Sequence, residues 1–170
     1  LPYGPRPLGE IRRYAGEIAG YLESQGVKLV VAACNAATSA ALPELQERLE
    51  VPIVGVITPE AHAAVLTTRN RRIGLLATQA TVTAGRYASL VHTLDAGVRF
   101  FPVACPRLVP LIESDEPFGE PTVAAVREYA EPRQWVTQDF HGATRTAVDS
   151  KEISKFLDVA AINPYHDTQE

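Results

Sequence analysis

The chain has 170 residues, of which 46% are hydrophobic and 21% charged, a composition typical of a globular protein with its own core. The net charge is −4 and no basic run stands out, which argues against nucleic-acid binding. No apolar stretch approaches the roughly 20 residues of a membrane helix, and the opening residues lack a signal-peptide pattern. We therefore expect one domain, or a fragment of a two-domain protein, without membrane contact.

The two cysteines are too few for a disulfide framework. Without an export signal, we expect free thiols in a reducing cytoplasm. Neither cysteine lies in a CxxC pair and the four histidines are scattered, so we expect no metal site.

Apolar periodicity predicts alternating helices and strands after an extended, proline-rich loop over residues 1–7. Helices are expected over residues 8–25, 37–49, 59–69, 83–94, 106–113 and 121–130. Strands are expected over residues 27–33, 52–57, 72–77 and 98–104, and the first should be fully buried because its apolar run does not alternate. A further strand over 134–137 and helix over 150–157 are expected in a more polar tail. The alternation predicts an α/β fold in which helices flank a parallel sheet.

Several loops follow directly after predicted strands, and ligands of α/β folds bind at such strand ends. These loops span residues 34–38, 57–60, 77–81 and 104–106. We expect all four to lie along one rim of the sheet, where they would form a small-molecule site.

Cys34 is the most reactive candidate in these loops. It lies between a strand end and a helix start, where free N–H groups and the helix dipole favour a thiolate. Asn35 and Thr78 could donate hydrogen bonds to a carboxylate without adding charge. Free cysteines are most often packing residues, so the two interpretations of Cys34 stand about even on position alone. For Cys105, which is followed by a proline, packing is favoured.

Five segments together resemble the glutamate racemases of the aspartate/glutamate racemase superfamily. They are "LPYGPRP", "LVVAACNAAT", "VPIVGVI", "RIGLLAT" and "ACPRLVPLIES", and the resemblance covers about residues 1–130. It implies two flavodoxin-like α/β domains with a site between them. Residues 1–57 would belong to the first domain and residues 58–131 to a second α/β unit. Residues 132–170 diverge and would hold the last strand and helix of the first domain.

The resemblance also implies a function. Members of this family interconvert L- and D-glutamate without a cofactor and supply D-glutamate for peptidoglycan. Two cysteines on opposite faces of the substrate take and return the Cα proton, because a single base tends to return the proton to the same face and regenerate the starting enantiomer. The implied partner is glutamate, with neither nucleic acid nor membrane involved. Matched to the family motifs, the catalytic residue is Cys34, the substrate-binding residues are Pro2, Tyr3, Gly4, Asn35 and Thr78, and a second-side acid is Glu113.

The chain departs from the family pattern at several places. Ala36 stands where a threonine usually follows the Cys-Asn pair, Thr58 and Glu60 replace a Glu and a Gly, and Ala84 replaces a serine. Neither the opening Asp-Ser-Gly loop nor the Gly-Cys-Thr-His-Tyr-Pro motif of the second cysteine occurs in the sequence. A sheet without its first strand exposes an edge, which we expect dimerisation or strand exchange to cover.

Three functions therefore stay open at this point. The first is a racemase with impaired activity, and the second is a non-catalytic module that binds a carboxylate or an amino acid. The third is a related isomerase or decarboxylase of small diacids.

Overall fold

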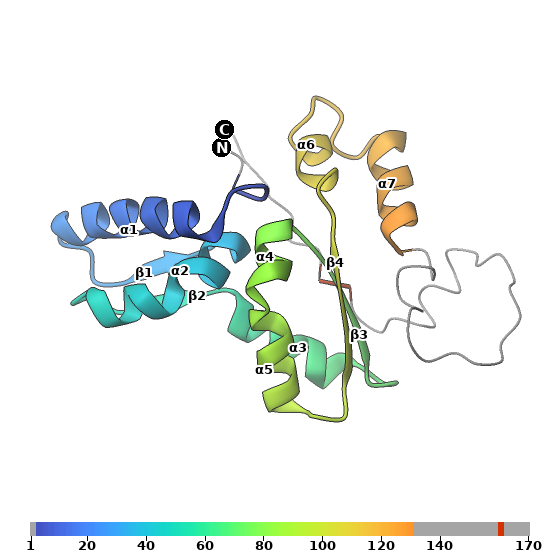
Figure 1. Ribbon diagram of the computed structural model, residues 1–170, viewed down its shortest axis with the longest axis horizontal. Coiled ribbons are helices and arrows are strands. Elements are labelled where there is room, and N and C mark those ends of the chain that lie inside the picture. Colours follow the sequence, from blue (N-terminus) through green and yellow to red (C-terminus); the bar gives the residue numbers. More distant parts are fainter. Residues whose placement is uncertain (1–2, 131–159, 162–170) are drawn as a thin grey trace, which may run out of the picture.

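The computed structural model describes residues 3–130 and 160–161 (Figure 1). The helices are α1 (Leu8–Ser24), α2 (Asn35–Arg48), α3 (Ile57–Thr67), α4 (Gln79–Ala84), α5 (Arg86–Leu94), α6 (Leu108–Ile112) and α7 (Glu120–Ala130). The strands are β1 (Val30–Ala32), β2 (Ile53–Gly55), β3 (Arg72–Ala77), β4 (Arg99–Ala104) and β5 (Ala160–Ala161). Pro2 and the elements expected over residues 134–137 and 150–157 lie outside the described residues.

All pairs among the described strands are parallel, which confirms the α/β fold, but these strands form two sheets instead of one. One sheet pairs β1 with β2, and the other has the order β4-β3-β5. Ile57, the first residue of α3, is buried against Ile73 and Leu75 of β3, so the chain leaves β2 directly for the second sheet. The expectation that all four loops share one rim of one sheet is therefore wrong. The domain boundary at residue 57 stays a prediction.

Helices α1 and α2 cover only one face of the β1–β2 sheet. Val30 and Ile53 point to that face and pack with apolar residues of both helices. Val31 and Val54 point to the opposite face and are 57% and 47% exposed. The strand expected over residues 27–33 is thus shorter and only half buried, because alternate side chains of a strand point to opposite faces.

Both faces of the second sheet carry helices. Leu75 of β3 packs with α3 and α5, while its neighbour Leu76 packs with α6 and α7 on the other face. The helix expected over residues 83–94 is two helices, α4 and α5. They are separated by Gly85, whose φ of 67° is the left-handed conformation that ends a helix.

The two sheets are joined through helices. A cluster of Ile11 from α1, Ala36 and Ala40 from α2, and Ala80 from α4 lies between them. The small side chains of α2 let the helices approach closely, so that α2 touches α1 and α4 at once (Figure 1). This contact holds the ends of β1 and β3 next to each other. None of the described helices is both long and apolar enough to span a bilayer.

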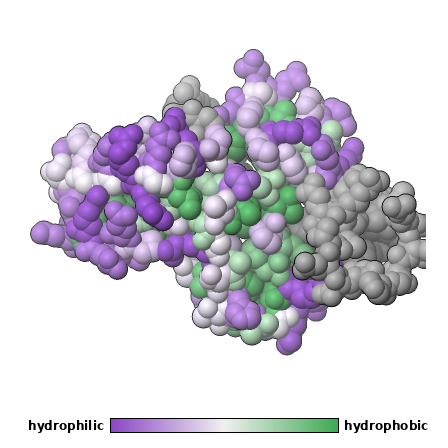
Figure 2. All heavy atoms as spheres, viewed as in Figure 1, coloured by the Kyte–Doolittle hydropathy of each residue, from purple (hydrophilic) through white to green (hydrophobic). Residues whose placement is uncertain are grey.

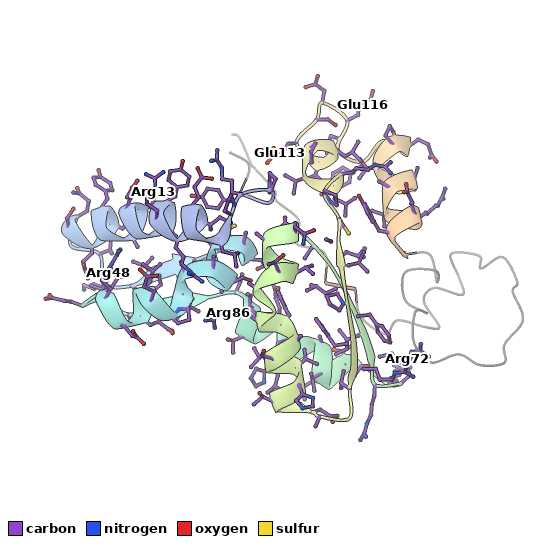
Figure 3. The ribbon with its side chains drawn as sticks, viewed as in Figure 1. Arg13, Arg48, Arg72, Arg86, Glu113 and Glu116 are labelled. Carbon is purple, nitrogen blue, oxygen red and sulfur yellow. The ribbon has the colours of Figure 1, made fainter. Side chains whose placement is uncertain are left out.

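A proline inside α2 changes the hydrogen bonding of that helix. Pro43 has no N–H, so the carbonyl of Ser39, four residues earlier, loses its helical donor. Arg86 of α5 replaces it, because its Nε donates to the Ser39 oxygen at 3.0 Å. In Figure 3, Arg86 lies between α2 and α5. A second guanidinium, that of Arg12 in α1, donates to the Ala40 oxygen at 2.7 Å.

Candidate functional site

A cavity of about 400 Å³ lies where the two sheets meet. Its walls come from the loop at residues 3–4, the ends of β1, β3 and β4, and helices α1, α2 and α6. The volume is in the range of small-molecule sites. In Figure 2, apolar side chains gather in the middle of the molecule, between the part formed by α1 and α2 and the part formed by α6 and α7.

Cys34 lines this cavity and is half buried. It is the N-cap residue of α2 with an extended backbone, and its carbonyl accepts the first helical hydrogen bond, from Thr38 N at 2.8 Å. The thiol makes no capping hydrogen bond to the helix. Its side chain packs against the cluster of Ile11, Ala36, Ala40 and Ala80, and its sulfur lies beside N–H groups that have no intrahelical partner.

Asn35 follows Cys34 as the first residue of α2 and is only 7% exposed. Its Nδ2 donates to the hydroxyl of Tyr87 at 3.0 Å and to Oε2 of Glu60 at 3.3 Å. Tyr87 in turn donates to the same carboxylate oxygen of Glu60. The amide nitrogen of Asn35 thus has two acceptors within the protein. Burial is the main cause that raises the pKa of Glu60, and the hydrogen bond from Asn35 opposes it.

The loop at residues 3–4 is fixed against Thr78. The backbone oxygen of Gly4 accepts from Ala80 N at 3.2 Å. A Cβ on Gly4 would lie 3.1 Å from the Cβ and Cγ2 atoms of Thr78, so a glycine permits this close approach. Thr78 caps α4 and accepts from the backbone N–H of Thr81, and Tyr3 stacks on Tyr14 with ring centroids 6.3 Å apart. The loop and the end of β3 therefore form one wall of the cavity.

Cys105 and Glu113 lie on the wall opposite α1. Cys105 is 1% exposed, and burial raises the pKa of its thiol to about 11. Its sulfur donates to the Val103 oxygen at 3.4 Å, as expected of a protonated packing residue. Glu113 ends α6 (Figure 3) and is exposed, although it lines the cavity.

The structure brings most of the predicted residues to one cavity. It is lined by Tyr3, Gly4, Cys34, Asn35, Thr78 and Glu113. Residues 57–60 do not line it, because they begin α3, and Glu60 contacts Asn35 instead. The sequence analysis did not identify Tyr87, and it named Glu60 only as a difference from the glutamate racemase motif. A glutamate inside the predicted helix over residues 59–69 gave no sign that it would meet an asparagine from another helix.

The parallel α/β units and the cysteine at a helix start beside a small-molecule cavity agree with the racemase class that the sequence motifs indicate. A family model described as Asp/Glu/Hydantoin racemase matches residues 8–138. Curated relatives include a glutamate racemase of Latilactobacillus sakei, 39% identical over 134 residues, which make up 79% of this chain and 49% of the relative. A glutamate racemase of Desulforudis audaxviator is 44% identical over 132 residues, 78% of this chain and 48% of that protein.

Solved structures agree with these relatives. The glutamate racemase of Francisella tularensis, in complex with D-glutamate, has a TM-score of 0.74 at 26% identity, and the match covers 96% of this chain and 62% of the Francisella chain. The enzyme from Thermus thermophilus, in complex with beta-chloro-D-alanine, has a TM-score of 0.64 at 45% identity, over 76% and 47% of the two chains. The chain belongs to the Asp/Glu racemase family that includes the glutamate racemases. It spans about half the length of the curated relatives that it matches.

Proposed function

We propose that this chain binds glutamate in the cavity and that Cys34 exchanges the proton on the glutamate Cα. The observation that carries this proposal is the position of Cys34, half buried on the cavity wall at a helix start, with no capping hydrogen bond from its sulfur to the helix. The similarity to glutamate racemases and the D-glutamate in the Francisella structure support the choice of ligand.

In this proposal the ligand carboxylates are held by uncharged donors. The N–H groups of the first turn of α2 have no intrahelical partner and favour an anion. The hydroxyl of Thr78 and the backbone of Tyr3 and Gly4 would hold the second carboxylate across the cavity. Asn35 would contribute through its place at the helix start, because its amide nitrogen already has two acceptors within the protein.

The proposed chemistry is proton transfer without a cofactor. The Cys34 thiolate takes the Cα proton, and the electron pair left on Cα is stabilised by the adjacent carboxylate and the donors around it. Inversion needs a second acid that returns a proton to the other face. We propose that a second group returns this proton and that the reaction makes D-glutamate for peptidoglycan. Glu113 is a candidate on the opposite wall.

A second candidate function is an amino-acid binding module without turnover. The observation that favours it is the state of Cys105, the only other thiol in the sequence. A buried thiol with a pKa of about 11 is a poor acid or base at neutral pH. The chain would then keep the pocket and Cys34 but lack inversion.

Incubation of each glutamate enantiomer in D2O separates these functions. Racemase chemistry gives deuterium at Cα together with the opposite enantiomer, both visible by NMR and chiral chromatography. Deuterium without inversion indicates that Cys34 works on one face only. A Cys34→Ala variant controls for adventitious exchange, and aspartate controls for the length of the ligand. Absence of exchange with binding of glutamate by calorimetry supports the binding module, whereas absence of both refutes the proposal.

A further inference from the structure

Three helices meet at one half-buried carboxylate. Glu60 comes from α3, Asn35 from α2 and Tyr87 from α5. Oε2 of Glu60 accepts from both the Asn35 amide and the Tyr87 hydroxyl, and the amide also donates to that hydroxyl. The three side chains therefore form a closed set of hydrogen bonds between elements far apart in the sequence. Among the residues that line the cavity, only Asn35 belongs to this set.

The cluster acts on the helix start that carries Cys34. Asn35 is the first residue of α2, and the N-cap residue directly before it is Cys34. Ala36, the next residue, is buried together with Ile11 and Ala80, so the backbone around the cysteine has little freedom. The side chain of Asn35 connects the start of α2 to α3 and α5 through hydrogen bonds.

We propose that Glu60 and Tyr87 are positioning residues, which hold Asn35 and thereby set the reactivity and ligand affinity of the Cys34 site. The proposal concerns the same cavity as the proposed function and rests on it for the identity of the ligand. Neither residue lines the cavity, so both would act only through Asn35.

The ionisation of Glu60 gives the arrangement a pH dependence. Ionised Glu60 accepts two charge-assisted hydrogen bonds, which weaken when the carboxyl takes up a proton. Burial raises the pKa of this group above its ordinary value of 4.5, and no neighbouring charge contributes. Besides Glu60 and Tyr87, α3 and α5 carry Arg86, which is bonded to the Ser39 oxygen, and the exposed His62 and His92. The charged groups of α2 are Glu44, Glu47 and Arg48, and all three are exposed. The arrangement around Asn35 should therefore change as the pH falls through the raised pKa of Glu60.

The test is the rate at which iodoacetamide alkylates Cys34, followed by peptide mass mapping between pH 4.5 and 8. Glu60→Gln keeps an acceptor oxygen but removes the titration, Glu60→Leu removes the acceptor, and Tyr87→Phe removes the bridging hydroxyl. Glu47→Gln, an exposed carboxylate on α2, is the matched control. Each rate is also measured with L- or D-glutamate, and the concentration that halves it gives the ligand affinity.

We expect the wild-type profile to contain a step near the Glu60 pKa that Glu60→Gln lacks and Glu47→Gln retains. Glu60→Leu and Tyr87→Phe should change the rate or the half-protecting concentration by roughly tenfold at pH 7.5, the size expected for a lost charge-assisted hydrogen bond. If the pH profiles of Cys34 alkylation in all variants superimpose on that of the wild type, the proposal is wrong. If glutamate protects no form of the protein, the proposed function fails, but the ligand-free profiles still decide the role of Glu60.

Discussion

The contact between Arg86 and the Ser39 carbonyl leads to a prediction about stability. Pro43 removes the helical donor of that carbonyl, and Arg86 supplies a replacement at 3.0 Å. Ser39 is only 5% exposed, so water cannot easily take the place of the guanidinium. Leaving a buried acceptor unsatisfied costs about 1–3 kcal/mol. We therefore expect Arg86→Met, which keeps much of the side-chain volume, to lower the free energy of unfolding by this amount.

A double-mutant cycle tests whether the proline is the cause. Pro43→Ala restores a backbone N–H that can bond the Ser39 oxygen, so the same Arg86→Met change should then cost close to nothing. Urea unfolding followed by circular dichroism gives the four free energies. An equal cost of Arg86→Met in both backgrounds would refute the reasoning, because it would show that the arginine stabilises the fold in some other way.

Three further predictions concern the described core and its titratable groups. Gly55→Ala should destabilise the protein by about 1–3 kcal/mol in urea unfolding, because its Cβ would collide with Cγ2 of Thr38; unchanged stability would contradict the close packing of β2 on α2. At pH 8, iodoacetamide should label Cys34 alone in the native protein and reach Cys105 only in denaturant, since a pKa of about 11 and burial both protect the latter thiol; rapid native labelling of both would contradict this. Because the folded pKa of Glu60 is raised, its contribution to stability is present below the unfolded pKa and is lost as the pH rises through the folded pKa. Glu60→Gln should therefore be at least as stable as the wild type at pH 7 and should lose that relative advantage at pH 4. The opposite order of stabilities in thermal melts would count against the partial burial of this carboxylate.

Much of the fold was predictable from local patterns. The strand over residues 72–77 is an apolar run bounded by polar residues, and β3 has the same bounds. The helix over residues 8–25 follows a clear apolar stripe, and α1 ends one residue earlier. In contrast, the pattern could not show that Val31 and Val54 lie on the face of the sheet opposite α1 and α2, because burial depends on which elements pack on each face.

The candidate site was predictable only in part. Cys34, Asn35 and Thr78 follow strand ends, and this rule led to residues that line one cavity. The partners of Asn35 were not predictable, because Glu60 and Tyr87 are 25 and 52 residues away along the chain and lie inside helices. The break at Gly85 was also hidden, since residues on both sides of it continue a helical pattern.

The most direct test of the central claim is protection of Cys34 by glutamate. The claim is that Cys34 lines the pocket that binds this amino acid. We predict that L- or D-glutamate slows alkylation of Cys34 at pH 7.5 in a saturable manner, whereas glutarate, which lacks the amino group, protects less. Alkylation of Cys34 at an unchanged rate in saturating concentrations of both enantiomers would contradict the account.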